Sequence, residues 1–249
     1  MGLRALVLIW LCVLSCAASA CQLVARAWDF APQYFLSGQG QWQGMAIEIV
    51  DALMKEAGCV VMYKSIPWAR AHKELRKGNL DLMMNLSKTP QRQTYLYFIG
   101  PVRDEVIKVI TLAELPYELR TLDDFKRLPR PVAAEAGAYF GTEFENKRLN
   151  DSDFKRKIAY SSRNENYAAL LSKARFSGYL DDMYSLMYFI KANNLSQRFK
   201  VQPIIVNQSQ VYLGVSKMSV SVERKQRLAQ ALLRIQAKGE IEKILRRYQ

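Results

Sequence analysis

The chain has 249 residues, of which 50% are hydrophobic, enough for one large domain or two medium-sized domains with their own cores. Its 36 Lys and Arg residues against 23 Asp and Glu give a formal net charge of +13, a balance compatible with nucleic acid, an anionic surface or an anionic ligand. The basic residues are interspersed with acidic ones, and no zinc-finger, RNA-binding or homeodomain-like motif is present. The sequence therefore argues against nucleic-acid binding and favours a solvated basic surface.

The first twenty residues have the pattern of an export signal. Arg4 supplies the positive region, residues 6–14 the apolar run, and Ala18-Ser19-Ala20 the cleavage site. This run is too short to span a membrane, and so is every later one. We expect a soluble periplasmic protein that begins at Cys21. A lipoprotein anchored at Cys21 is the alternative, although Ala18 fits poorly where leucine is usual.

The mature chain would retain two cysteines, Cys21 and Cys59, each just before a predicted strand. If these strands are parallel neighbours, the two sulfurs start side by side. A disulfide in an oxidising compartment would then stabilise the fold by roughly 3–4 kcal/mol. Acylation of Cys21 and this disulfide exclude each other, and we favour the disulfide.

Strands and helices alternate along the first hundred residues, which predicts an α/β unit with a mainly parallel sheet. Glycines 58 and 78 are placed to end the two helices. The expected elements are strands at 23–27, 60–64 and 80–84, and helices at 45–57 and 68–77.

The segment after the third strand predicts an anion site. The strand leads into the polar loop 85–88, and Thr89-Pro90 supplies an N-cap and a first helical residue. Arg92 then falls in the first turn, beside free backbone N–H groups, and its guanidinium can bind a carboxylate at two points. The structural alternative is a surface arginine at a helix start.

A second α/β unit is expected beyond a β-rich run at 106–112. Its predicted strands are 132–134, 176–180, 201–206 and 211–215, and its predicted helices are 140–147, 164–173, 183–192, 222–235 and 240–248. The chain is expected to cross between two lobes near 106–109 and near 203–210, which creates a hinge over a cleft. We assign 21–107 plus 209–249 to lobe 1 and 108–208 to lobe 2.

Several motifs, spread over nearly the whole mature chain, resemble the bacterial periplasmic solute-binding proteins of the polar amino-acid type (extracellular solute-binding protein family 3). The resemblance implies an α/β, two-lobed periplasmic-binding-protein fold of type II. The motifs are Phe30-Ala31-Pro32, Gly44 with Glu48 and Asp51, Gly78-Asn79-Leu80-Asp81, Ser87-Lys88-Thr89-Pro90-Gln91-Arg92, Phe98 with Pro101, and Asp182.

The same resemblance implies a site for a zwitterion. Arg92 would bind the ligand's α-carboxylate with Ser87 beside it, and Asp182 would receive the α-ammonium. The further positions are the sandwiching aromatics Phe30 and Trp68, the loop Gly137-Ala138-Tyr139 with its backbone amides, Asn85 where glycine is common, and Arg70, which could face the cleft or the solvent. Asp182 could alternatively serve only as a helix N-cap.

The implied function is the binding of a small carboxylate-bearing solute, an amino acid foremost, for delivery to an inner-membrane ABC permease. We expect a monomer with no cofactor, no metal and no nucleic-acid partner. One alternative is a dehydratase acting on a cyclic carboxylate in the same cleft, for which Glu135 is the candidate acid or base. A second alternative is a sensory binding module. His72, the only histidine, is expected to face solvent.

Overall fold

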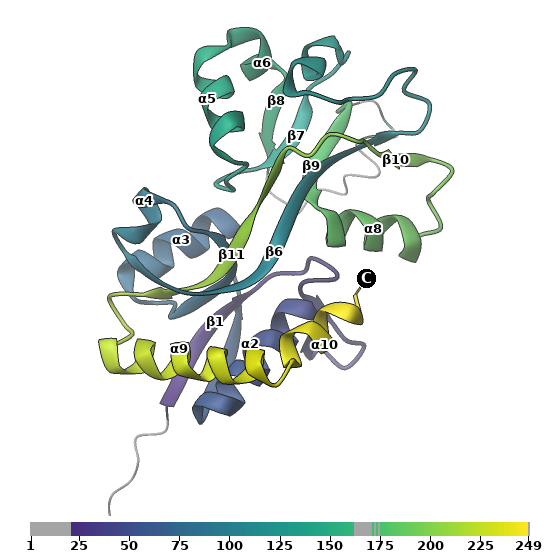
Figure 1. The fold of residues 1–249 in the computed structure, drawn as a ribbon. Coiled ribbons are helices and arrows are strands. Elements are labelled where there is room, and N and C mark those ends of the chain that lie inside the picture. Colours follow the sequence, from purple (N-terminus) through teal and green to yellow (C-terminus); the bar gives the residue numbers. More distant parts are fainter. Residues whose placement is uncertain (1–20, 162–170, 172, 174, 249) are drawn as a thin grey trace, which may run out of the picture.

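The computed structural model describes residues 21–161, 171, 173 and 175–248. The predicted export signal and most of the helix predicted at 164–173 therefore lie outside the described residues. Figure 1 shows two bodies of strands and helices, joined by the long strands β6 (Leu96–Leu112) and β11 (Asn207–Ser216). This is the predicted two-lobed α/β arrangement. The predicted crossing at 106–109 lies within β6, and the one at 203–210 overlaps only the start of β11.

Lobe 1 contains the first predicted α/β unit. Strand β1 pairs in parallel with β4 and β5, because the helices between them carry the chain back to the same edge. A small antiparallel pair, β2 with β3, lies in the loop after β1. The bounds are β1 Cys21–Ala27, β2 Phe35–Leu36, β3 Trp42–Gln43, α2 Met45–Ala57, β4 Cys59–Ser65, α3 Trp68–Lys77, β5 Leu82–Ser87 and α4 Pro90–Gln93.

Lobe 2 is built around strand β7, which pairs in parallel with β8 and β9. A capping box at Thr121 opens a 3-10 helix, in which the Thr121 N–H donates a hydrogen bond to the Asp124 carboxylate. The bounds are η2 Leu122–Arg127, β7 Val132–Glu135, α5 Thr142–Asn150, α6 Ser152–Arg156, β8 Ile158–Ser161, β9 Gly178–Asp182, α8 Met183–Ala192 and β10 Phe199–Val201.

The two hinge strands make the sheet mixed rather than mainly parallel. Strand β11 lies antiparallel between β5 and β6, and β6 pairs antiparallel with β9 on its lobe 2 half. The order β4-β1-β5-β11-β6-β9-β7-β8 therefore runs from one lobe into the other. A bend of this shared pair of strands changes the distance between the lobes while each lobe's own sheet keeps its hydrogen bonds.

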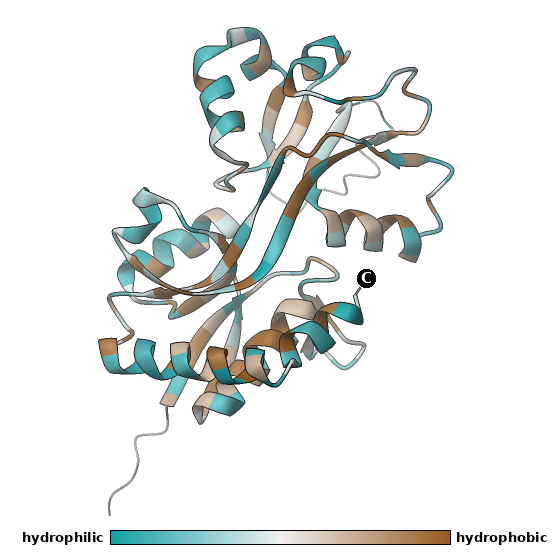
Figure 2. Cartoon of the chain, viewed as in Figure 1, coloured by the Kyte–Doolittle hydropathy of each residue, from teal (hydrophilic) through white to brown (hydrophobic). Residues whose placement is uncertain are grey.

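The C-terminal helices return to lobe 1, as predicted. Helix α9 (Val222–Ala237) packs along α2, and α10 (Glu240–Arg246) closes the same layer. In α10's C-terminal turn, Arg247 and Tyr248 both donate to the Glu48 carboxylate on α2. Figure 2 shows hydrophobic residues along β6 and a largely hydrophilic α5 on the outside of lobe 2. Each lobe has its own buried apolar clusters on the two faces of its sheet.

The predicted disulfide is present. Cys21 and Cys59 are direct partners in the parallel register of β1 and β4, and their sulfurs are bonded. The bridge closes a loop with a sequence separation of 38 residues, which restricts the unfolded chain.

We expect reduction of this disulfide to lower the free energy of unfolding by about 3–4 kcal/mol, through the greater freedom of the reduced unfolded chain. For a chain of this length that corresponds to a melting temperature lower by about 10 °C. Thermal unfolding with and without a reductant measures the difference. The variant Cys21→Ser/Cys59→Ser should melt like the reduced protein in both conditions, and equal melting of oxidised and reduced wild type would contradict the prediction.

Candidate functional site

A cavity of about 60 Å³ lies between the lobes beside the hinge strands. Arg92 and Trp68 both donate to the Gly137 carbonyl across the gap between the lobes, so this conformation is a closed one. Charged and aromatic side chains from both lobes line the cavity. The lining residues are Arg26, Phe30, Gln33, Tyr34, Trp68, Asn85, Ser87, Arg92, Arg103, Glu105, Ile107, Glu135, Ala138, Tyr139, Phe140, Asp181 and Asp182.

Arg92 is held at the cavity by the local structure that the sequence predicts. The Thr89 hydroxyl accepts a hydrogen bond from the Arg92 backbone N–H and so caps α4. The guanidinium is buried and donates to the carbonyls of Ser87 at 2.9 Å and Gly137 at 3.1 Å. Within the described residues Arg92 forms no ion pair. Burial lowers the pKa of this guanidinium because it disfavours the charged form. An anion in the cavity would stabilise the charged form.

Gly137 links the lobes through its carbonyl rather than through an amide. Its oxygen accepts from Arg92 Nη2 and from Trp68 Nε1, both at 3.1 Å. The neighbouring amides are already bonded, that of Ala136 to the Ser161 carbonyl and that of Ala138 to the Glu135 carbonyl. In this closed conformation the Gly137 oxygen is therefore one of the two carbonyl acceptors of the Arg92 guanidinium.

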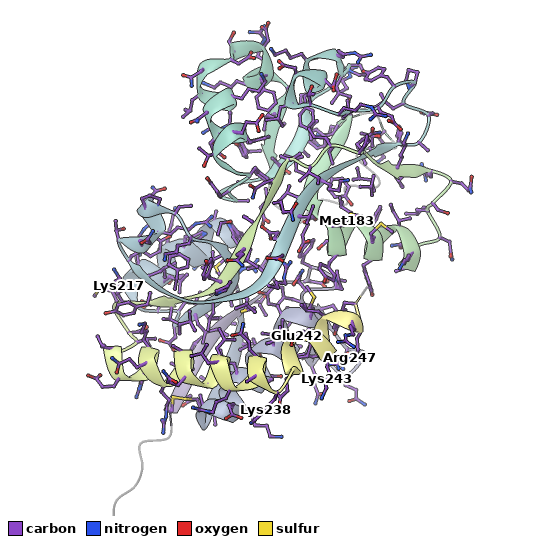
Figure 3. The ribbon with its side chains drawn as sticks, viewed as in Figure 1. Met183, Lys217, Lys238, Glu242, Lys243 and Arg247 are labelled. Carbon is purple, nitrogen blue, oxygen red and sulfur yellow. A yellow bond between two sulfur atoms is a disulfide. The ribbon has the colours of Figure 1, made fainter. Side chains whose placement is uncertain are left out.

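Asp182 is a helix N-cap and also lines the cavity. It ends β9 and caps α8, since its Oδ1 accepts from the Tyr184 N–H. Its Oδ2 lies at the cavity, 2.5 Å from Arg103 Nη2 and 3.3 Å from Gln33 Nε2. Met183 marks the start of α8 beside the hinge in Figure 3, directly after this carboxylate. The expected ammonium acceptor thus already holds a cation of the protein.

Arg103 comes from the hinge strand β6. Its side chain is 1% exposed, and besides Asp182 it has Glu105 at 3.8 Å. Its Nη2 also donates to Asn85 Oδ1 at 3.2 Å. Burial opposes the charge, but the carboxylates of Asp182 and Glu105 outweigh it and raise the pKa of Arg103. The hinge therefore carries a buried ion pair between the lobes.

Asn85 completes this polar network. Its φ is +61°, a left-handed conformation that glycine adopts freely and that asparagine tolerates better than most residues. Its amide donates to Gln33 Oε1 at 3.0 Å, while its oxygen accepts from Arg103. Asn85 thus retains the backbone geometry of a glycine and adds two hydrogen bonds that fix Gln33 and Arg103.

The structure brings most of the predicted site residues together and excludes one. Seven of the predicted residues line the cavity: Arg92, Ser87, Asp182, Phe30, Trp68, Asn85 and Tyr139. Gly137 reaches Arg92 through its carbonyl. Glu135, the carboxylate considered for catalysis, also lines the cavity. Arg70 is a correction: its side chain is 73% exposed and pairs with Glu74, because it points away from the cleft on α3.

Sequence reasoning missed several residues of the cavity, above all Arg26, Gln33, Arg103, Glu105 and Asp181. For Arg103 and Glu105 a signal was present, since the charged triplet 103–105 interrupts an apolar strand next to the predicted crossing. Gln33 directly follows the Phe30-Ala31-Pro32 motif. Arg26 is the only charged residue of strand β1, and its guanidinium lies over the rings of Tyr34 and Trp68.

His72 corrects a second expectation. It is 8% exposed rather than solvent-facing, because its face of α3 packs under the cleft. Its Nδ1 is 2.9 Å from the Tyr95 hydroxyl, and Trp68 meets its ring edge-on. Burial, with the positive charges of Arg92, Arg76 and Arg26, lowers the pKa of His72 to about 3.

We therefore expect His72 to make folding pH-dependent. Between its folded pKa of about 3 and its unfolded value of 6.5, only the unfolded state binds the proton, so stability falls as the pH falls through this window. From pH 7 to pH 4 the loss through this residue is about 3 kcal/mol. Urea unfolding at both pH values measures this loss of unfolding free energy. Between the same two pH values, the His72→Asn variant should lose about 3 kcal/mol less than the wild type. Equal losses in the two proteins would contradict the prediction.

In the described part of the chain, no three His, Cys, Asp or Glu side chains gather in a way that would hold a metal ion. None of the helices there combines the length and apolar character needed to cross a bilayer.

Comparison with known proteins agrees with this architecture. The family of bacterial extracellular solute-binding proteins, family 3, matches residues 23–249. The probable amino-acid-binding protein YxeM of Bacillus subtilis (strain 168) is 22% identical over 210 residues, 84% of this chain and 76% of the relative. A probable histidine-binding protein of Neisseria gonorrhoeae is 24% identical over 233 residues, 90% and 81% of the two chains.

Solved structures share the fold. An ABC uptake transporter substrate-binding protein from Streptococcus pneumoniae with bound histidine has a TM-score of 0.77 and 18% identity. The alignment covers 91% of this chain and 92% of that one. At this identity the likeness concerns the fold alone.

Proposed function

Since the chain belongs to the bacterial extracellular solute-binding proteins of family 3, we propose that its cleft binds a small carboxylate-bearing solute, an amino acid foremost, for delivery to an ABC permease. The observation that carries this proposal is Arg92, a buried guanidinium at the cleft whose partners are two carbonyl oxygens. A carboxylate that replaces the Gly137 carbonyl would form the two-point, charge-assisted contact that a carbonyl cannot form.

The proposal extends to the environment of the protein. The export signal is removed after Ala20, and the mature periplasmic chain begins at Cys21, bridged to Cys59 rather than acylated. Lobe 1 comprises 21–107 and 209–249, and lobe 2 comprises 108–208. The protein acts as a monomer whose partners are the solute and an inner-membrane permease. A role in sensing would use the same cleft.

A thermal-shift screen of amino acids, small peptides and organic acids tests this function. A ligand that binds only the native protein adds about 2.7 kcal/mol at a hundredfold excess over Kd, which raises the melting temperature by several degrees. A response from at least one carboxylate is expected. If no carboxylate shifts the melting temperature, the proposal fails.

A catalytic role is the second candidate, because Glu135 lines the same cavity at the end of β7 and is buried. A carboxyl group there could act as an acid or base on a bound cyclic carboxylate. Turnover of such a compound that is lost in Glu135→Gln would favour the enzyme. Binding without turnover, retained in Glu135→Gln, would favour the solute-binding function that we propose.

A further inference from the structure

The Arg103–Asp182 ion pair involves the carboxylate to which the family resemblance assigns the ammonium group of an amino acid. Asp182 Oδ2 is 2.5 Å from Arg103 Nη2, with side chains 6% and 1% exposed. The carboxylate also accepts from Gln33 and from the Tyr184 N–H, so its oxygens are surrounded by donors. An incoming ammonium that approaches Oδ2 therefore competes with Arg103 for this oxygen.

Displacement changes the charge balance of the hinge. The Arg103 guanidinium is held by β6 and by bonds to the Asp104 carbonyl and to Asn85, so it stays buried at the cavity when its closest carboxylate is taken. Glu105, at 3.8 Å, is its remaining carboxylate in the described structure. Removing one partner of a buried ion pair costs several kcal/mol, which a ligand with a neutral side chain cannot offset.

Resting on the proposed function, we propose that Arg103 is the specificity-determining residue of this site, and that it selects α-amino acids carrying a second carboxylate. Such a solute exchanges partners with the ion pair. Its α-carboxylate binds Arg92, its ammonium binds Asp182, and its side-chain carboxylate binds the displaced Arg103. Each buried charge then has an opposite charge before and after binding.

Charges of both signs line the cavity, namely the guanidiniums of Arg26, Arg92 and Arg103 and the carboxylates of Glu105, Glu135, Asp181 and Asp182. A second carboxylate on the solute is therefore favoured by the exchange at Arg103 and not by the overall charge of the lining. Arg92 and Arg103 belong to the lobe 1 side, while Asp182 comes from lobe 2, so a three-point contact would hold both lobes on the ligand. Without Arg4 of the export signal the net charge is 13 − 1 = +12, which would attract an anionic solute from a distance.

Matched pairs of ligands test the inference on the wild-type protein. Titration calorimetry with glutamate and glutamine, and with aspartate and asparagine, compares solutes of the same shape that differ in one charge. We expect the acid of one pair to bind roughly 100-fold more tightly than its amide. Equal or tighter binding of the amide in both pairs would overturn the inference while the proposed function stands. Binding of organic acids without any amino acid would also overturn it, because the ion pair would then remain intact.

The variant Arg103→Gln supplies a readout that a purely structural role would not give. Its amide can hydrogen-bond a neutral side chain, so the preference should change from the acid to the amide, whereas a general loosening of the cleft would weaken both ligands alike. Arg103→Lys keeps the charge and should keep the preference for the acid at reduced affinity. Equal weakening of acid and amide in both variants would overturn the inference. If the wild-type protein binds no carboxylate at all, the proposed function itself is wrong.

Discussion

Replacing Arg92 with methionine is expected to weaken solute binding by 100-fold or more, because the solute carboxylate would be desolvated in the cleft without its cation. Loss of one partner of a buried, hydrogen-bonded charge pair costs about 2–5 kcal/mol, much of it from the charge left unpaired. Methionine retains most of the length of the arginine side chain, so the shape of the cavity changes little. Calorimetry with the best ligand of the thermal-shift screen measures the effect.

Lys238→Met is the matched control. Lys238 lies on the outside of lobe 1 at the end of α9, where it pairs with Glu56 on the surface. Figure 3 places it on the side of lobe 1 that faces away from lobe 2. This variant should keep the affinity of the wild type. If both variants weaken binding equally, or if Arg92→Met binds normally, Arg92 does not hold the solute.

Gly44→Ala is expected to destabilise the fold by about 4 kcal/mol, through strain and overpacking. Gly44 precedes α2 with φ +120°, a conformation that L side chains rarely adopt. An added Cβ would lie 2.5 Å from the Gln33 carbonyl oxygen and 2.7 Å from that of Pro32, both backbone atoms. Those carbonyls accept from the N–H groups of the first two residues of α2, so movement breaks the start of the helix. Urea unfolding measures the loss.

The variant Gly40→Ala separates the effect of backbone strain from the effect of overpacking. Gly40 also has positive φ, +75°, but an added Cβ there meets no atom within 4 Å. The free energy of unfolding of this variant should fall only by the cost of the backbone strain, about 1–2 kcal/mol. Because Gln33 bonds both Asn85 and Asp182, Gly44→Ala should in addition weaken solute binding, and Gly40→Ala should not. Equal stability of the two variants would show that the close contact is relieved without cost.

Local sequence was sufficient to predict that Arg92 lies in the first turn of a helix. The N-cap threonine, the proline and the arginine lie within four residues, so short-range hydrogen bonding positions the side chain whatever surrounds it. The disulfide was also predictable, because each cysteine begins a strand and parallel register aligns the strand starts. Arg70 and His72, on one short helix, were misjudged because a charge-rich helix leaves open which face meets the cleft, and the packing of α3 decided it.

The amino-acid sequence by itself determined the alternation of strands and helices, the two hinge crossings, the cysteine bridge and the arginine at a helix start, since each depends on neighbouring residues or on simple periodicity. Only the tertiary structure decided what lies opposite that arginine. Arg103 and Asp182 are 79 residues apart, and Gly137 lies 45 residues from Arg92. These contacts exist because two hinge strands bring the lobes together. Electrostatic pairing across such distances is set by the packing of both lobes, which no local pattern encodes.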